Sequence, residues 1–484
     1  MKEYFLYKNK KYCIRDDYVN NEYLKKYNKK DLLDSFYNIS KDIYKLNKKK
    51  NFLNMNYKFY VFDNREEYKI SHLKMLLPSQ LVRLSYYSLI YGNNKIITNN
   101  KKIENDKNIL GLLDNNLCGD INILKRDNIA MLHSMGQDQF WCQCINNEIY
   151  NFSRNYEILE YIQCGNKDKI FNDVLGMTYN DFNKAMLELL VMYIHIDNQN
   201  EVFDKIINYD KNSYKLIQYY TFNLDTDKHM GYQGLLYKPF IKINNKYILT
   251  NIYSLFKCFS NSAYWVIRNY YCKQGDGSFI TEFGNKAEIY IHKLLDTYLN
   301  NKYVYNKIKE KKSKTCDWAI ETNKYILLIE QKTYLENLKS KNIDIDIKKF
   351  REDIKKYKTA IEQLNTTEKN DYNCSPKKVI KIILHYDEFY FQSSILGTLK
   401  DEKDYDINNM IMLNMDEFER IIYCLSCDEE KFNHIIEEIL YGYNNYNGKD
   451  IEIILREQKI KNDYCKNIKN NFDKIKNDII KIGF

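Results

Sequence analysis

Two acidic residues and a lysine in the C-terminal half of the chain have the types and spacing of a site that works with a divalent metal ion. In the run YILLIEQK, the two-residue period of a β-strand puts Glu330 and Lys332 on one face. Asp317 precedes Glu330 and is separated from it by twelve residues. Carboxylates bind Mg²⁺, and such an ion can supply hydroxide and stabilise phosphate charge in phosphodiester hydrolysis. These residues therefore predict a metal-dependent hydrolytic site.

Two neighbouring strands must position this trio. We expect strands at Lys302–Ile308, Cys316–Glu321 and Tyr325–Thr333, since each run is β-type. A short connection at Thr322-Asn323 makes the last two strands antiparallel and brings Asp317 toward the end of the sheet that carries Glu330.

Helices are predicted on both sides of these strands. The first runs from about Gly284 to Leu299, and a second follows the strands. A buried strand at Val379–His385, a strand at Met410–Leu413 and a helix capped by Asp416 complete the order αβββαβ(βα). The expected stripe of the first helix is Ile289, His292, Leu295 and Tyr298, and that of the second is Ile347, Phe350, Ile354, Tyr357, Ile361 and Leu364.

Asp317 followed by Glu330-Gln-Lys332, in this order of elements, resembles the PD-(D/E)xK nuclease superfamily, which has a restriction-endonuclease-like core. The resemblance implies that Asp317 and Glu330 bind Mg²⁺ or Mn²⁺ and that Lys332 positions or deprotonates the attacking water. Cys316 stands where the name-giving proline would be. The short motif recurs in this lysine-rich chain, for example at Glu67-Tyr-Lys69, so its placement after an apolar strand and between helices carries the argument.

The resemblance adds two further catalytic candidates. Glu288 lies where a helix before the core often supplies a third metal-binding glutamate; a solvent-facing helix residue fits it equally well. Gln363 corresponds loosely to a glutamine that some branches place beside the site, and an ordinary structural role suits it better. For the trio itself, the alternative is a surface strand pair with a cross-strand Lys–Glu contact.

Basic residues flank the proposed site and predict a phosphate track for a nucleic-acid partner. A lysine-rich solvated surface is an equally good interpretation of any single one, because acidic residues interrupt the second group. The nucleic-acid-binding candidates are Lys311, Lys312 and Lys314 before Asp317, and Lys348, Lys349 and Lys355 after Lys332.

The sequence predicts an α+β fold in four parts. They are a mainly helical accessory or sensor region (1–230), a hairpin and helical connector (231–278), a nuclease-like αβββαβ domain with a mixed sheet (279–440) and a C-terminal amphipathic helix (441–484). The connector begins with two alternating runs, Phe240–Ile243 and Lys246–Leu249, joined by Asn244-Asn245, which tolerates the backbone of a tight turn. Pro78 is expected to open an earlier helix.

Composition favours a cytoplasmic protein with no membrane partner. The chain has 484 residues, a net charge of +9 and 12 scattered cysteines, and it lacks both an apolar run of membrane-spanning length and a signal-peptide core at its N-terminus. Walker A, HExxH and GxSxG motifs are absent, which argues against an ATPase, a zincin and a serine hydrolase. Cys424 and Cys427 have metal-ligand spacing without a second pair, so a zinc site is disfavoured.

The expected function is a metal-dependent endonuclease that acts on nucleic acid, with DNA favoured by family analogy. Nucleases of this superfamily with large accessory regions often serve in defence against foreign DNA, and this layout resembles theirs. The N-terminal region is expected to sense a trigger or position the substrate, with a homodimer or a protein trigger as its partner. The alternatives are a catalytically inactive nucleic-acid-binding or repair-accessory protein, and a helical interaction protein with a coincidental motif.

Overall fold

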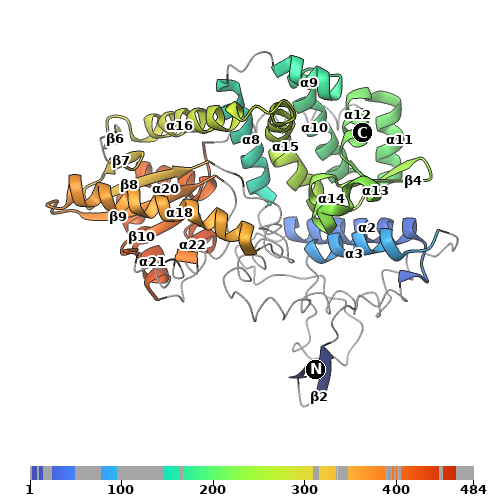
Figure 1. The fold of residues 1–484 in the computed structure, drawn as a ribbon, viewed down its shortest axis with the longest axis horizontal. Helices are drawn as coiled ribbons and strands as arrows, with labels where there is room; N and C mark the ends of the chain where they lie inside the picture. The colour runs from blue at the N-terminus through green and yellow to red at the C-terminus, as the bar shows by residue number, and fades with distance from the viewer. Residues whose placement is uncertain are drawn as a thin grey trace. The chain divides into compact units, whose positions relative to one another are not determined.

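A computed structural model gives the fold, and it divides the chain into two compact units (Figure 1). The first unit comprises residues 1–125 and 189–258, and the second comprises 126–188 and 259–484. The units are interleaved along the chain, whereas the predicted domains are continuous ranges. The structure describes residues 3–7, 10–14, 24–49, 78–94, 145–162, 167–308, 315–333, 335, 347–386, 392, 395–396, 399, 405–445 and 451–464.

The first unit is mainly helical and contains a three-stranded sheet of order β3-β4-β5. Helix α3 begins at Pro78, as predicted, because proline has no N–H to lose at a first helical position. The hairpin is also confirmed, with positive φ at Asn244 and Asn245. The described elements are β1 (Glu3–Tyr7), β2 (Lys10–Ile14), α2 (Lys29–Lys49), α3 (Pro78–Tyr91), α11 (Gln199–Tyr209), α12 (Lys211–Tyr219), β3 (Thr221–Phe222), α13 (Leu224–Asp227), η4 (Lys228–Gln233), α14 (Gly234–Tyr237), β4 (Phe240–Ile243) and β5 (Lys246–Leu249).

The second unit contains the predicted series of strands and helices. Helices α10 (Tyr179–His195) and α15 (Ile252–Lys273) each contribute residues to both units. The other described elements are α8 (Ile145–Tyr161), α9 (Lys167–Leu175), α16 (Ser278–Leu299), β6 (Val304–Lys307), β7 (Trp318–Glu321), β8 (Tyr325–Lys332), α18 (Ile347–Thr367), η5 (Glu368–Tyr372), β9 (Lys378–His385), β10 (Met410–Asn414), α20 (Met415–Cys427), α21 (Glu429–Asn445) and α22 (Ile451–Glu457).

A five-stranded mixed sheet of order β10-β9-β8-β7-β6 forms the centre of this unit. Strands β6, β7 and β8 are antiparallel neighbours, while β8, β9 and β10 are parallel. The chain is thus an α+β protein, and the described part of residues 1–230 is mainly helical, as predicted. Strand β8 lies in the middle of the sheet, where both faces are covered, which explains its unbroken apolar run.

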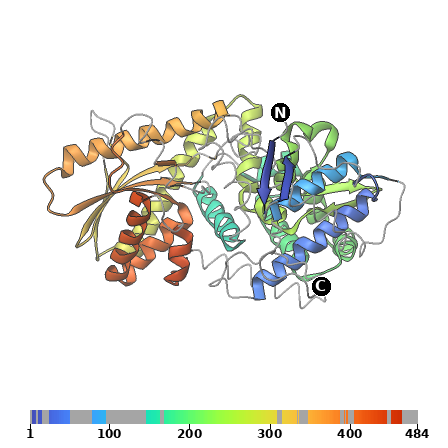
Figure 2. The same cartoon turned by 90° about the horizontal axis from the view of Figure 1, so that it is seen from below.

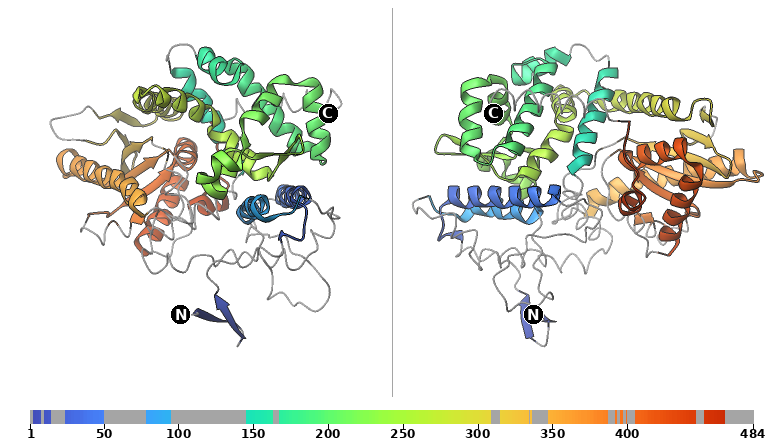
Figure 3. Two further views of the ribbon diagram at one scale, coloured as in Figure 1. Left: turned by 45° about the vertical axis from the view of Figure 1, so that its right-hand side comes forward. Right: turned by 180° about the vertical axis from the view of Figure 1, so that it is seen from behind.

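Helices cover both faces of the sheet. Figure 2 shows α18 along one face and the C-terminal helices on the other, and Figure 3 (right) shows the same layers from behind. The predicted stripe of α18 is buried at Phe350, Tyr357 and Leu364. The stripe predicted for α16 is wrong, because Ile289 is exposed. The helix instead buries Phe279, Phe283, Ala287, Tyr290, Ile291, Leu294, Leu295 and Leu299.

Two predicted helix boundaries differ from the structure. Helix α20 is capped by Asn414, not Asp416: the Asn414 side chain accepts from the Glu417 N–H, and the Glu417 carboxylate accepts from the Asn414 N–H. This reciprocal capping box satisfies two N–H groups at once. Within the predicted C-terminal helix 441–484, the structure describes α21 as far as Asn445 and α22 over Ile451–Glu457, and the described residues 458–464 are not helical. Residues 465–484 lie outside the described part of the chain.

No helix in the described ranges is long and apolar enough to cross a membrane.

A buried ion pair ties α8 to α20 within the second unit. Arg154 Nε and Nη2 donate to the two carboxylate oxygens of Glu419 at 2.6 and 2.8 Å, and both side chains are almost fully buried. Tyr290 also donates to Glu419, at 2.7 Å. Since α8 belongs to this unit, a deletion of residues 1–230 would leave the Glu419 carboxylate without its guanidinium partner.

Replacing Arg154 with Met is expected to lower the free energy of unfolding by about 3 kcal/mol, because it leaves a buried carboxylate without its counter-charge. Urea denaturation followed by circular dichroism would measure the loss. Arg268→Met is the matched control: Arg268 stacks on Trp265, and its loss should cost less than about 1 kcal/mol. Equal losses in the two variants would contradict a special role for the buried pair.

Candidate active site

Strand β8 carries Glu330 and Lys332 to the end of the sheet, on the face covered by α18. The Lys332 ammonium donates to Glu330 Oε1 at 2.5 Å and to Gln363 Oε1 of α18 at 3.3 Å. Gln363 Nε2 in turn donates to the Thr315 carbonyl at 3.1 Å. The Glu330 side chain is 3% exposed and that of Lys332 is 18% exposed. Gln363 is therefore brought to the motif residues and holds the lysine in place.

Asp317 lies immediately before β7, beside Glu330 in the adjacent strand. Its N–H donates to the Ile329 carbonyl at 3.0 Å, which continues the pairing of β7 with β8. Its carboxylate accepts from the Gln331 N–H at 2.7 Å. Asp317 and Glu330 interact electrostatically. The structure thus brings together the two acids that the sequence predicts to share a site.

Burial controls the electrostatics of both acids. The pKa of Glu330 is raised to about 7, mainly by desolvation and in addition by the nearby Asp317 carboxylate, while the Lys332 ammonium acts in the opposite direction. Desolvation likewise raises the pKa of Asp317, opposed mainly by the hydrogen bond from the Gln331 backbone. A cation placed between these carboxylates would stabilise their charged forms.

The raised pKa of Glu330 predicts a pH-dependent loss of stability. Between pH 4.5 and 7 this glutamate ionises in the unfolded chain but stays protonated in the folded one, so stability falls as pH rises. Glu330→Gln should therefore be more stable than the wild type above pH 7, by on the order of 3 kcal/mol, with no difference below pH 4.5.

Urea denaturation of the two proteins at pH 4.5, 6 and 8 would measure this effect. Glu362→Gln, on the exposed side of α18, serves as a control and should follow the wild type. Parallel pH profiles for Glu330→Gln and the wild type would show that Glu330 ionises normally in the folded protein.

Glu288 approaches the site from α16 and forms an ion pair with Lys307 of β6. Both charges act on Asp317: Glu288 raises the pKa of Asp317, and Lys307 lowers it. Glu288 is thus close enough to Asp317 to influence its charge, and its ion-pair partner in the structure is Lys307.

The predicted nucleic-acid-binding lysines divide into two groups. Lys348 and Lys355 are exposed on α18, and Lys349 pairs with Glu352 at 2.6 Å. Lys311, Lys312 and Lys314 lie outside the described residues. Three of the six predicted lysines thus lie on α18, the helix that also carries Gln363.

The donor set suits a hard divalent cation. Among the described residues, Glu330 Oε2 is buried without a hydrogen-bond partner, although a carboxylate oxygen requires a proton donor or a cation. In the same part of the chain, no three His, Cys, Asp or Glu side chains are grouped as a ready-made metal site. Asp317 and Glu330 form the carboxylate pair, and the third candidate, Glu288, is held by Lys307.

Sequence reasoning missed the specific partners Lys307 and Thr315. Lys307 is one of many basic residues before Asp317, and nothing in the sequence singles out Thr315. The signal for Lys307 was its register, since pairing of β6 with β7 sets it opposite Trp318, the neighbour of Asp317. No sequence signal points to the Thr315 carbonyl, which any residue at that position would supply.

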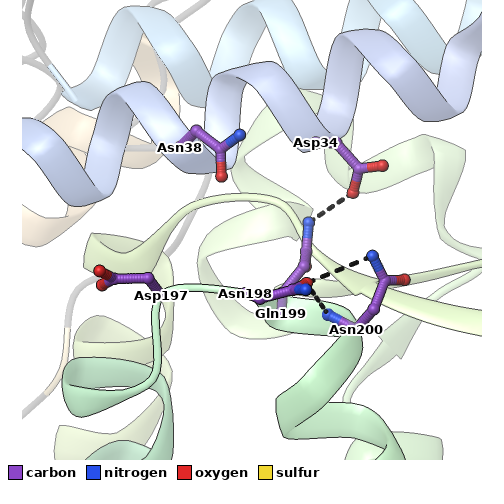
Figure 4. Close-up of a pocket in the computed structure, with 6 residues that line it drawn as sticks. All are labelled: Asp34, Asn38, Asp197, Asn198, Gln199 and Asn200. Carbon is purple, nitrogen blue, oxygen red and sulfur yellow. Dashed lines mark hydrogen bonds between the residues drawn. The ribbon is translucent and has the colours of Figure 1, made fainter.

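A polar cavity of about 310 Å³ lies within the first unit (Figure 4). Its carboxylates already have partners: Asp34 accepts from Gln199 at 2.6 Å, and Asp197 pairs with Lys45 at 2.6 Å. None of the predicted site residues lines this cavity, so the candidate active site is the one in the second unit. The cavity is lined by Asp34, Asn38, Asp197, Asn198, Gln199 and Asn200.

Comparison of the chain with protein-family models, curated proteins and solved structures gives no significant match.

Proposed function

We propose that the second unit is a metal-dependent nuclease with a restriction-endonuclease-like core. The observation that carries the proposal is the convergence of Asp317, Glu330 and Lys332 at one end of two adjacent strands. The element order α16-β6-β7-β8-α18-β9 around them is the order expected of that core. Catalytic carboxylates with raised pKa values, next to a partly exposed lysine, are typical of functional sites.

Each residue has a distinct role in this proposal. Bound Mg²⁺ or Mn²⁺ would supply positive charge beside the phosphodiester and make a water molecule more acidic. Asp317 and Glu330 would hold the ion, with Glu288 as the third carboxylate. Lys332 is partly exposed and orients the attacking water, and Gln363 keeps the lysine pointed at the site.

Nucleic acid is the proposed partner, with DNA favoured over RNA. The support is the set of lysines on α18 together with the chemistry of the site, since phosphates are bound by lysine ammonium groups. The first unit is proposed to regulate the site, through a protein trigger or a homodimer, because it contributes none of the catalytic candidates.

Incubation of the full-length protein with supercoiled plasmid, single-stranded DNA and RNA tests the proposal. Parallel reactions contain Mg²⁺, Mn²⁺ or EDTA. Cleavage of at least one substrate that requires metal is expected. Absence of cleavage under all conditions, together with no Mn²⁺ binding in calorimetry, would refute it.

The competing function is a nucleic-acid-binding protein that retains the fold without catalysis. The pairing of Glu288 with Lys307 favours it, because one carboxylate of the metal set is then already neutralised. Salt-dependent DNA binding without Mn²⁺ binding would support this alternative.

A further inference from the structure

Lys307 lies beside the carboxylate site on an edge strand. It is the last residue of β6, and the N–H of the next residue, Ile308, donates to the Asp317 carbonyl at 2.9 Å. β6 ends the order of described strands, so its outer side has no described strand beside it. The Lys307 side chain is 57% exposed. The lysine can therefore reach both the site and a molecule bound outside it.

The ion pair between Lys307 and Glu288 is exchangeable. The Glu288 side chain is 29% exposed, and an ion pair with this much solvent contact adds little to stability. Glu288 would have a second, doubly charged partner if a divalent cation were bound beside Asp317. Lys307 would then compete with that cation for one carboxylate, and its ammonium would be released where the cation binds Glu288 more strongly.

We propose that Lys307 binds a backbone phosphate of the nucleic-acid substrate once a divalent cation has taken its place on Glu288. This assignment rests on the proposed nuclease function. Lys307 then has two opposing effects. It weakens metal binding in the absence of substrate, and it strengthens substrate binding in the presence of metal. A lysine with a merely structural role would do neither.

Lys307→Met in the full-length protein separates the two effects. Isothermal titration of Mn²⁺ without nucleic acid should show binding about tenfold tighter than in the wild type, because Glu288 no longer has a competing partner. Cleavage in saturating Mn²⁺ should show KM raised about tenfold, with kcat within about threefold of the wild type. The slope of log KM against log salt should fall by about one.

Two further variants sharpen the test. Lys307→Arg keeps the positive charge, so it should restore KM toward the wild-type value. Lys302→Met is the matched control: Lys302 precedes the same strand, but its ammonium donates to the Ser426 carbonyl at 2.8 Å, and its loss should change neither Mn²⁺ affinity nor KM. Thermal melting should be the same for all four proteins.

The possible failures are distinguishable. A wild-type protein that cleaves, together with a Lys307→Met variant unchanged in Mn²⁺ affinity and KM, overturns this assignment alone. A wild-type protein that binds no Mn²⁺ and cleaves nothing overturns the proposed function and this assignment with it.

Discussion

Asp317→Asn is expected to reduce metal-dependent cleavage by at least about 10³-fold and to abolish measurable Mn²⁺ binding at micromolar protein. The substitution removes one of the two carboxylates that would hold the cation, and Glu330 alone leaves too few anionic ligands at the site. The amide oxygen of the new side chain can still accept the Gln331 N–H, so the strand connection is kept. Cleavage rates and Mn²⁺ titration together would measure the change.

The matched control is Glu321→Gln, at the far end of the same strand. Glu321 pairs with Lys377 at 2.8 Å and is half exposed, so its loss should leave cleavage within about twofold of the wild type. Unaltered cleavage by Asp317→Asn would show that any nuclease activity arises elsewhere in the protein.

Lys332→Met is expected to lower kcat by about 10² to 10⁴-fold, because Lys332 is the residue proposed to position or deprotonate the attacking water. Mn²⁺ binding should be retained or become tighter, because Glu330 no longer shares its charge with an ammonium. Loss of turnover with retention of metal thus separates this variant from Asp317→Asn. Single-turnover cleavage and Mn²⁺ titration would measure both.

Lys324→Met provides the control for this second variant. Lys324 precedes the first residue of β8, and its ammonium contacts Glu437 on α21, so it shares the strand but not the site. Its removal should leave kcat unchanged. If Lys332→Met were fully active while Asp317→Asn was inactive, the proposed metal site would stand and Lys332 would have no role in catalysis.

Because the two units alternate along the chain, a deletion from the N-terminus cannot remove the first unit alone. A deletion of residues 1–230 removes α8, and with it the Arg154 side chain that pairs with buried Glu419. Loss of activity in such a truncation would therefore report a damaged second unit. Surface substitutions within the first unit would test its proposed regulatory role without damaging the second unit.

Several elements could be predicted from the sequence because their causes are local. The apolar run before Glu330 requires a buried strand, and Asn244-Asn245 supplies the positive φ of the hairpin turn. The stripe that includes Phe350 and Leu364 was correct because α18 has a single apolar face. The positions of Asp317, Glu330 and Lys332 on neighbouring strands follow from the same local patterns.

Other features required the tertiary structure because their partners are far apart in the chain. Helix α16 carries apolar residues on much of its circumference, so only packing decides that Tyr290 is buried while Ile289 is exposed. Asn414 caps α20 because β10 ends there, a boundary that periodicity does not locate.

Strand period and hairpin spacing were enough to place Asp317, Glu330 and Lys332 together in the candidate site. Their electrostatic surroundings depend on the folded chain: α18 brings Gln363 to Lys332, and the edge strand β6 sets Lys307 against Glu288. The physical reason is that side-chain period is a property of one segment, whereas a charge acquires its partner and its desolvation from segments that fold against it.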